Sequence, residues 1–402
     1  MVLGAGKAAA AMAAAVEAHW CGPLSGLVVT RYGHAVRLEQ IEVVEAGHPL
    51  PDAAGLAAAD RMLRLAAGLG EDDLALCLFS GGGSALLPAP APGVDFAAKQ
   101  EVTRRLLRSG AGIVEINTVR AHLSIIKGGW LAAACSPARV VTLVVSDVPG
   151  DSAAAVASGP TSADATTFSD ALAVLRRYHV DGPPAVLDHL HAGERGGPGD
   201  PAETPKPGDP RLARTEMRVV ARSADALEAA ASEARAAGIE PIVLGDGIQG
   251  EARAVAAEHA RLASILATDG GAALRLVLSG GETAVTVRGP GRGGRNAEYL
   301  LALAIELGGD HRVTALAADT DGIDGTEDNA GAVIDPTTLA RAAAAGLDAE
   351  AALARNDSYG FFAALGDLVI TGPTRTNVND FRAMVIAPGK AAQRRPAADP
   401  GR

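Results

Sequence analysis

The 402-residue chain is long enough for two or three domains, and its 48% hydrophobic content excludes an intrinsically disordered protein. The formal net charge of −11 argues against a general binding surface for nucleic acids or anionic membranes, and no apolar run reaches the roughly 20 residues that a transmembrane helix needs. The three cysteines, Cys21, Cys77 and Cys135, have no metal-ligand spacing, so we expect free thiols in a reducing cytoplasm.

The first half of the chain alternates apolar runs with Ala-rich helical segments. VLGAG at 2–6 predicts a strand and a glycine turn, and residues 7–18 predict a helix. Strands that alternate with helices are typical of a parallel, doubly wound sheet. Because the chain opens inside an α/β unit, we expect a complete product to carry a segment before this strand. Further strands are expected at 27–30, 41–46, 74–79 and 140–151, and helices at 53–69, 99–108 and 117–135.

A segment rich in Pro, Gly and charge, 192–215, is predicted to be a linker or mobile loop. It would separate a first domain, 1–191, from a second, 216–387, with a solvated tail at 388–402. The second domain is expected to begin with a strand at 217–221 and to repeat the alternation. Its other predicted strands lie at 240–245, 274–282, 283–289 and 313–319, with two more in 367–387. A Ser-Gly-Gly turn at 279–281 is expected to break the strand at 274–282. The predicted helices lie at 224–237, 251–267 and 297–307.

The apolar run LALCLF at 74–79 leads into a glycine turn, SGGGS. Its residues are Ser80, Gly81, Gly82, Gly83 and Ser84. Three glycines let the backbone turn sharply and direct several N–H groups into one space, where they can bind phosphate or carboxylate. A turn with no ligand remains the alternative.

The loop GPGRGGRN, 289–296, places Arg292 and Arg295 just before a predicted helix. Cations are unfavourable at a helix N-terminus, so two arginines there indicate a bound anion. The alternative is a pair of solvated surface arginines.

The acidic loop DTDGIDGTED, 319–328, superficially resembles a calcium loop. Ile323 at the fifth position and Ala330 at the twelfth break the EF-hand pattern. A magnesium or general-base role for one or two of its carboxylates stays open, as does a chain of Asx turns.

Other motifs exclude some enzymes and leave one alternative. The chain has no P-loop and no protein-kinase catalytic loop, and Leu78 breaks a nucleophile elbow around Ser80. LGAGKAA at 3–9 satisfies Gly-x-Gly-x-x-Ala, a variant of the dinucleotide fingerprint, and Arg31 could meet a 2′-phosphate. An NADP-dependent reductase therefore remains an alternative.

Several long motifs together resemble the glycerate 2-kinase family, also called class II glycerate kinases, whose C-terminal portion is the MOFRL domain. The similarity runs over about residues 1–386, and a segment that usually precedes the first strand is missing. The motifs are SGGGSALL, VRAHLSIIKGG, SDVPGD, ASGPT, LSGGETAVTVRGPGRGGRNAEYLLALA, TDGIDG with AGAVID, NDSYGFF and TGPTRTNVND.

The resemblance implies that ATP phosphorylates D-glycerate at its 2-hydroxyl, with magnesium. It implies two α/β domains, the first Rossmann-like and the second with a mixed sheet, and an active site in the cleft between them. The lysine and arginine regarded as active-site residues in such enzymes fall on Lys7 and Arg295. Family members have often been labelled hydroxypyruvate reductases, which matches the reductase alternative.

Phosphoryl transfer requires in-line positioning and neutralised charge, which suggests a role for each group. We expect Lys7 and Arg295 to bind the anions, and the SGGGS turn to hold a carboxylate or phosphate. Asp147 or Asp321 would accept the 2-hydroxyl proton or bind magnesium. Glu282, which ends a predicted buried strand on a Gly-Gly turn, is a second magnesium candidate. The walls would be completed by Lys127, Asn377, Asn379 and Asp380.

The expected partner is the small-molecule substrate, without nucleic acid or membrane, and a homodimer is considered. A third reading is a non-catalytic regulator that binds sugar acids.

Overall fold

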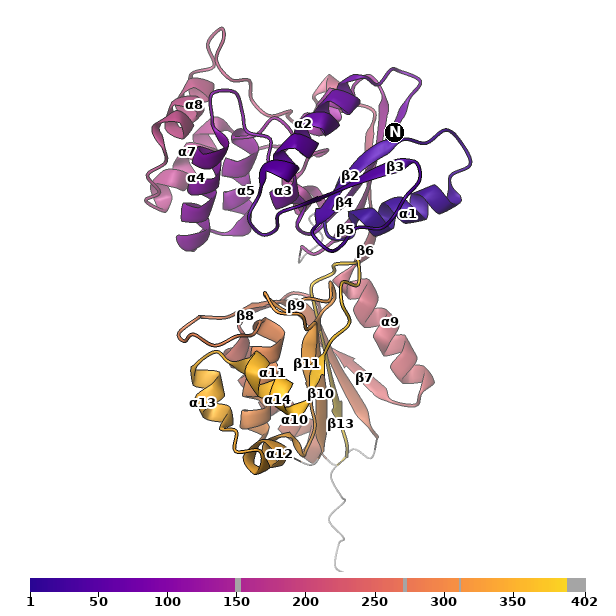
Figure 1. Cartoon of the computed structure of the whole chain (residues 1–402), viewed down its shortest axis with the longest axis vertical. Coiled ribbons are helices and arrows are strands. Elements are labelled where there is room, and N and C mark those ends of the chain that lie inside the picture. The colour runs from indigo at the N-terminus through magenta and orange to yellow at the C-terminus, as the bar shows by residue number, and fades with distance from the viewer. Residues whose placement is uncertain (149–152, 270–272, 311, 389–402) are drawn as a thin grey trace, which may run out of the picture. The chain divides into compact units, whose positions relative to one another are not determined.

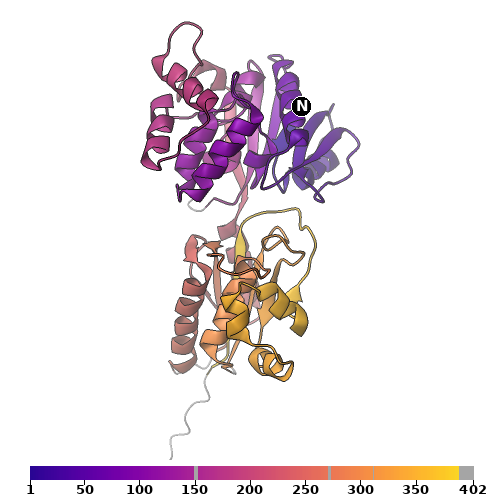
Figure 2. The same cartoon turned by 60° about the vertical axis from the view of Figure 1, so that its left-hand side comes forward.

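The computed structural model of the chain describes residues 1–148, 153–269, 273–310 and 312–388. These residues divide into two compact units. The first comprises 1–222 with 375–378, and the second comprises 223–374 with the residues from 379 onward (Figures 1 and 2). Within the described ranges, no helix is long and apolar enough to cross a membrane.

The first unit alternates strands and helices from its first residues. Its elements are β1 (Val2–Ala5), α1 (Ala9–His19), β2 (Gly26–Arg31), β3 (Ile41–Ala46), α2 (Ala53–Ala67), β4 (Leu74–Ser80), α3 (Gly83–Leu86), α4 (Phe96–Arg108), α5 (Ile113–His122), α6 (Trp130–Cys135), β5 (Arg139–Ser146), the 3₁₀ helix η1 (Ala153–Ser158), α7 (Phe168–Arg177), α8 (Pro184–Arg195), the 3₁₀ helix η2 (Pro210–Leu212) and β6 (Thr215–Arg222).

All six strands form one parallel sheet in the order β3-β2-β1-β4-β5-β6. The apolar run in β4 lies at its centre, where Cys77 pairs with Leu3 of β1 and Leu78 pairs with Leu143 of β5. This order is that of a Rossmann sheet, whose direction of winding reverses between β1 and β4. The prediction of a parallel α/β first domain is therefore confirmed.

Both faces of this sheet are buried, which explains its unbroken apolar runs. Cys77 and Phe79 belong to the core beneath α2, whereas Leu78 belongs to the core beneath α1. Cys77 and Cys135 are buried free thiols, as expected, and burial raises the pKa of the Cys77 thiol well above its usual value.

Four helices of the first unit, α4, α5, α7 and α8, pack on one another beside the sheet and enclose a separate apolar core (Figure 1). The prediction of continuous helix over 117–135 is wrong. The structure has two helices, α5 and α6, separated by a segment in which Gly128 and Gly129 take φ angles of +56° and +87°. A left-handed backbone cannot continue a right-handed helix, so the chain turns there.

The segment 192–215 lies within the first unit and packs on it. Its first residues belong to α8. The side chain of Glu203 accepts a hydrogen bond from the amide of Phe168, at 2.9 Å, and lies 3.1 Å from His122 Nε2. The strand expected to open the second domain, 217–221, is part of β6 and pairs with β5 in the first sheet. Both expectations were wrong because side-chain hydrogen bonds and strand pairing, which composition does not show, anchor these residues.

The second unit contains a mixed sheet. Its elements are α9 (Ser223–Ala236), β7 (Glu240–Val243), β8 (Ile248–Glu251), α10 (Ala252–Thr268), β9 (Arg275–Ala284), α11 (Arg295–Leu307), β10 (Val313–Asp319), β11 (Gly331–Ile334), α12 (Thr338–Ala344), α13 (Ala349–Ala354), α14 (Ser358–Leu365), β12 (Leu368–Val369) and β13 (Asp380–Ile386).

The strands follow the order β12-β11-β10-β13-β9-β7, with β8 also paired to β9. The contacts of β9 with β7 and β8 are parallel, and the others are antiparallel. Met384 and Ile386 of β13 face the core with α10 and α11, whereas Phe381 and Ala383 face α9 across the sheet. The predicted α/β second domain with a mixed sheet is confirmed.

Two expectations in this unit need correction. Ser279, Gly280 and Gly281 do not form a turn, because β9 continues through them and pairs with β13. A Cβ at Gly281 would lie 2.1 Å from the carbonyl oxygen of Ile248, so this glycine permits the close approach of β8. The strand expected at 283–289 ends at Ala284.

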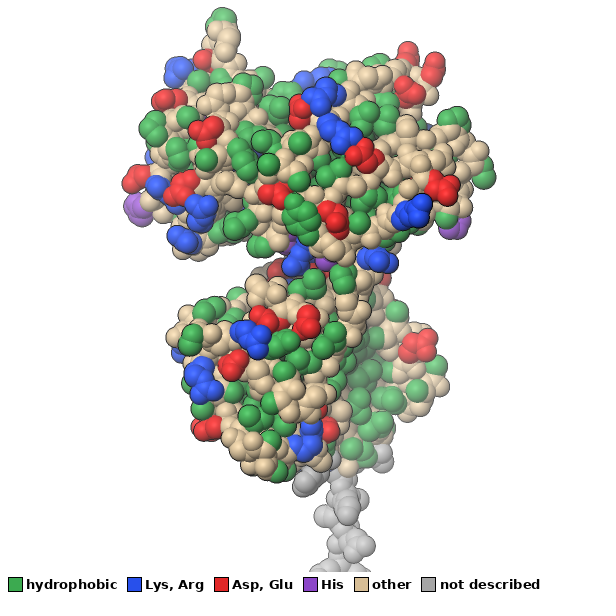
Figure 3. Space-filling model, viewed as in Figure 1, with side chains coloured by type: hydrophobic (Ala, Val, Ile, Leu, Met, Phe, Trp, Pro, Cys, Tyr) green, Lys and Arg blue, Asp and Glu red, His purple; other side chains and the backbone are tan. Residues whose placement is uncertain are grey.

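The tail expected at 388–402 falls outside the described residues except for its first position. On the face drawn in Figure 3, acidic and basic side chains are interspersed on both units.

Candidate active site

In the first unit, the turns after β1 and β4 are joined where the strand order reverses. The amide of Lys7 donates to the carbonyl oxygen of Gly81, at 2.9 Å, and the amide of Ala8 donates to Ser80 Oγ, also at 2.9 Å. Ser80 is fully buried, so its hydroxyl holds the two turns together. The structure thus places Lys7 beside the SGGGS turn, at the position where sheets of this order bind ligands.

The glycines of the turn are required because other side chains pack against it. A Cβ at Gly81 would lie 1.9 Å from Asp147 Oδ2 and 2.0 Å from Asn377 Nδ2. Gly82 has a φ angle of +83°, and a Cβ there would lie 3.0 Å from His48 Cδ2. The turn therefore forms a surface covered by polar side chains, which sequence reasoning foresaw except for His48.

Asp147 follows β5, the neighbour of β4, and completes this group. The side-chain amide of Asn377 donates to Asp147 Oδ2, at 3.0 Å. Asn377 is 3% exposed and belongs to the short stretch 375–378 that clusters with the first unit. The neighbouring parallel strands β1, β4 and β5 thus bring Lys7, the glycine turn and Asp147 to the same edge of the sheet.

Lys127 supports the end of the same turn from inside the protein. It is 1% exposed, and its ammonium donates to the carbonyl oxygen of Ser84, at 2.8 Å. The Ser84 hydroxyl lies 2.8 Å from that of Ser158, which donates to Asn117 Oδ1. Burial, followed by the charges of Lys99 and Arg120, lowers the pKa of Lys127 well below its usual value.

In the second unit, Arg295 begins α11 within a group of carboxylates. Its Nε lies 2.8 Å from Asp380, its Nη2 lies 2.7 Å from Asp319, and its Nη1 lies 3.4 Å from Glu282. Burial alone would lower the pKa of Arg295, but the attraction of these carboxylates has the larger effect and raises it. The guanidinium is therefore permanently charged and held in a fixed orientation.

Asp380 and Asp324 connect this arginine to the start of α11. Asp380 is buried and also accepts from Asn296 Nδ2, at 2.8 Å, and from Arg382. Asp324 is buried and accepts from the amides of Asn296 and Ala297, at 3.0 and 2.8 Å. It thereby satisfies free amides at the N-terminus of the helix. Sequence reasoning did not single out Asp324 within the acidic loop.

Burial raises the pKa of Asp324 to about 6, although the two amide hydrogen bonds oppose this change.

The other predicted residues of this unit lie in different surroundings. Asp321 is fully buried, and its Oδ1 accepts from the amide of Ile323, at 2.8 Å, in an Asx turn. The carbonyl oxygen of Asn379 accepts from the amide of Thr320, at 3.0 Å. Arg292 is exposed, lies 4.7 Å from the centre of the Tyr359 ring and pairs with Glu327, at 3.2 Å. The two arginines of the GPGRGGRN loop therefore have different partners.

The two predicted magnesium ligands, Glu282 and Asp321, differ in their surroundings. Within the described ranges, no group of three His, Cys, Asp or Glu side chains could hold a metal ion. Glu282 lies two residues before the end of β9, with 53% of its side chain exposed, whereas Asp321 is buried and accepts a hydrogen bond from the amide of Ile323. The hard oxygen donor of Glu282 suits a magnesium ion that takes most ligands from water and phosphate.

Residues 1–191 match a family described as a domain of unknown function (DUF4147), and residues 275–380 match the MOFRL family. The chain is 40% identical to a D-glycerate 2-kinase from Thermotoga maritima, with 94% of this chain and 89% of that protein covered. It is 51% identical to a protein from Agrobacterium vitis named "Putative hydroxypyruvate reductase", with 96% and 87% covered. A crystal structure of glycerate kinase from Thermotoga maritima superposes with a TM-score of 0.84 at 39% identity, covering 96% of this chain and 91% of that one.

Proposed function

The chain belongs to the same family as these glycerate 2-kinases, and we propose that it transfers the terminal phosphoryl group of ATP to the 2-hydroxyl of D-glycerate, giving 2-phospho-D-glycerate. The proposal rests on the edge of the first sheet at which β1, β4 and β5 end. This edge places a cation, a turn rich in backbone amides and a carboxylate side by side. Phosphoryl transfer depends mainly on such positioning and charge neutralisation.

We assign the charged groups as follows. Lys7 and the amides of the SGGGS turn bind the phosphate or the glycerate carboxylate. Asp147 accepts the proton of the 2-hydroxyl, because it is half-buried at the strand edge, whereas Asp321 is fully buried in its own turn. The hydrogen bond from Asn377 fixes the orientation of the Asp147 carboxylate.

Arg295 is proposed to stabilise the negative charge that develops during transfer. Its three carboxylate neighbours keep it ionised and immobile, which suits a group that must not reorganise during the reaction. Arg292, Asn379 and Asp380 remain predicted contacts. That the two domains share one active site also remains a prediction.

Magnesium is proposed to enter with the nucleotide. Glu282 is the better ligand candidate, and Asp321 is the weaker one because of its burial. When bound, the ion would neutralise phosphate oxygens.

The names of the Agrobacterium vitis relatives keep an NADP-dependent hydroxypyruvate reductase as the second candidate. One observation favours the kinase. Gly6 is the second glycine of the dinucleotide fingerprint, and a Cβ at this position would lie 2.1 Å from Ser80 Oγ. In a dinucleotide site this glycine admits the pyrophosphate, but here it admits a serine of the neighbouring turn.

Purified protein with D-glycerate, ATP and magnesium should give a 2-phosphate signal in phosphorus NMR. NADPH oxidation on hydroxypyruvate without phosphorylation would replace the kinase by the reductase. Ligand binding without either turnover would favour the sugar-acid-binding regulator. We further propose a cytoplasmic enzyme, and size-exclusion chromatography would test the homodimer.

A further inference from the structure

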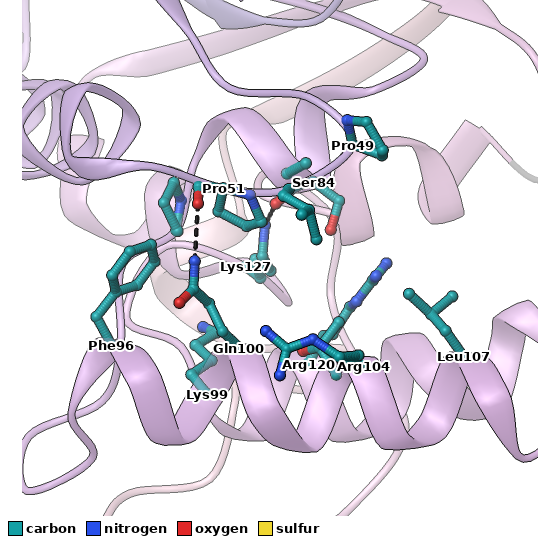
Figure 4. Close-up of a pocket in the computed structure, with 14 residues that line it drawn as sticks. Pro49, Pro51, Ser84, Phe96, Lys99, Gln100, Arg104, Leu107, Arg120 and Lys127 are labelled. Carbon is teal, nitrogen blue, oxygen red and sulfur yellow. Dashed lines mark hydrogen bonds between the residues drawn. The ribbon is translucent and has the colours of Figure 1, made fainter. Parts of the chain in front are cut away.

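A pocket in the first unit gathers cationic side chains around one opening (Figure 4). It lies between α4 and the facing loop that contains Pro49 and Pro51. Its cations are Lys99 and Arg104 from α4, Arg120 from α5, and Lys127. No acidic side chain of the described chain lines it, so the pocket concentrates positive charge in a protein of net charge −11.

The two lysines are buried and have neutral partners. Lys99 is 6% exposed and its ammonium donates to the carbonyl oxygen of Leu123, at 2.7 Å. Lys127 is 1% exposed and donates to Ser84, as described above. Burial, followed by the charge of Arg120, lowers the pKa of Lys99 to about 7.

The two arginines differ in whether an acidic side chain pairs with them. Arg104 pairs with Glu101, one turn earlier on the same helix. Arg120, by contrast, has no salt bridge to any acidic side chain in the part of the chain that the structure describes. Burying several cations together without a counter-charge is costly, and a bound anion would offset that cost.

The size and walls of the pocket limit what can bind. Its volume is about 70 Å³, which is room for a small group such as one carboxylate or phosphate. Pro88, Phe96 and Leu107 add apolar surface around the cations, which suits a short carbon skeleton.

We propose that this pocket is an oxyanion site, in which Lys99, Arg120 and Lys127 bind the carboxylate or phosphate group of a small organic acid. The site is defined by binding alone and goes beyond the proposed reaction. Because Lys127 holds the carbonyl of Ser84, an anion in the pocket competes for the same ammonium and acts on the end of the SGGGS turn.

The test is calorimetric titration with inorganic phosphate and, separately, with D-glycerate. It is done in a Lys7→Met background so that the proposed phosphoryl-transfer site does not contribute. Arg120→Met and Lys99→Met should each weaken binding by roughly tenfold to a hundredfold, the value of a hydrogen bond to a charged group. Arg108→Met, which removes an exposed cation at the end of the same helix, should leave the affinity unchanged.

Thermal unfolding separates binding from folding. Without anion, Lys99→Met should unfold at the same or a higher temperature, because an uncompensated buried charge is removed. It should lose the rise in unfolding temperature that phosphate gives the parent protein. Unchanged anion affinity in Arg120→Met and Lys99→Met would overturn the proposal, as would a lower unfolding temperature with an unchanged phosphate response.

Two further results identify the source of the anion and separate this site from the reaction. Competition between phosphate and D-glycerate would identify the acid of the reaction as the occupant, whereas loss of phosphate binding alone in Arg120→Met would indicate a separate anion. Both results support the site.

Phosphorylation of D-glycerate by the Lys7-containing protein, together with an anion affinity that Arg120→Met does not change, would overturn only the anion site. Arg120-dependent anion binding without phosphorylation would overturn only the reaction.

Discussion

The side-chain amide of Asn377 donates a hydrogen bond to Oδ2 of Asp147, 3.0 Å away and 230 positions earlier in the chain. Asp147 directly follows β5 of the first sheet, and Asn377 belongs to a stretch of four residues, 375–378, that clusters with the first unit. A carboxylate at the edge of the parallel sheet is therefore oriented by one of the last described segments of the chain.

Asn377→Ala should lower kcat for D-glycerate phosphorylation by roughly tenfold or more, because a hydrogen bond to a charged group is lost. KM should change less than kcat if the bond orients the base instead of binding substrate. A double mutant with Asp147→Ala should be no slower than Asp147→Ala alone. Additive losses would show that Asn377 acts independently of Asp147.

Gly81→Ala should disrupt the same contact from the other side. A Cβ there would overlap Asp147 Oδ2 and Asn377 Nδ2, at 1.9 and 2.0 Å, so one of the two side chains must move. Activity should fall at least as far as in Asn377→Ala. Gly68→Ala is a suitable control, since its Cβ would find only carbonyl oxygens, at 3.5 and 3.7 Å, and its φ angle is −86°. Equal activities of the two variants would contradict the packing described.

Arg295→Ala should reduce both stability and turnover. The substitution removes the arginine that pairs with the buried carboxylates of Asp319 and Asp380, and breaking such a buried pair costs about 3–5 kcal/mol of unfolding free energy. Urea unfolding measures this loss, and turnover should be measured where the variant is still folded. For comparison, Arg292→Ala should cost only about 1 kcal/mol, because its stacking on Tyr359 is exposed. Full turnover in folded Arg295→Ala would rule out a role for this arginine in charge stabilisation.

Protonation of His259 should destabilise the second unit in acid. His259 is buried with its Nδ1 2.8 Å from the Tyr299 hydroxyl, and burial lowers its pKa to about 4 from the ordinary histidine value of 6.5. The unfolded chain gains this proton first, so its contribution is complete above pH 6.5 and falls by about 3 kcal/mol as the pH drops through 4. In His259→Gln, the unfolding free energy should depend less on pH across this range.

Asp324 should act in the opposite direction over nearly the same range. Its pKa is raised to about 6, so its contribution is complete below pH 3.8 and is lost as the pH rises through 6, again by about 3 kcal/mol. In the parent protein the two effects nearly cancel. Asp324→Asn should therefore expose the fall of stability in acid that His259 causes. Parallel pH profiles for the two variants would refute one of these assignments.

The sequence by itself determined the local structure and indicated which residues could serve the proposed site. Apolar runs, Ala-rich helices and the SGGGS glycines have short periods and steric requirements that act within a few residues. For that reason the strand at 74–79, the turn after it and the neighbouring Lys7 could be predicted. The roles proposed for Asp147 and Arg295 were inferred from their residue types and their positions near turns.

The tertiary structure decided what pairs with what. The strand at 217–221 joins the first sheet, residues 279–281 continue a strand, and Glu203 anchors the segment expected to be a linker. No local pattern places Asn377 on Asp147, or brings Lys99 and Arg120 together around a pocket. Such contacts join residues far apart in sequence, and they are selected by burial and hydrogen-bond satisfaction over a whole unit, which no short window of sequence contains.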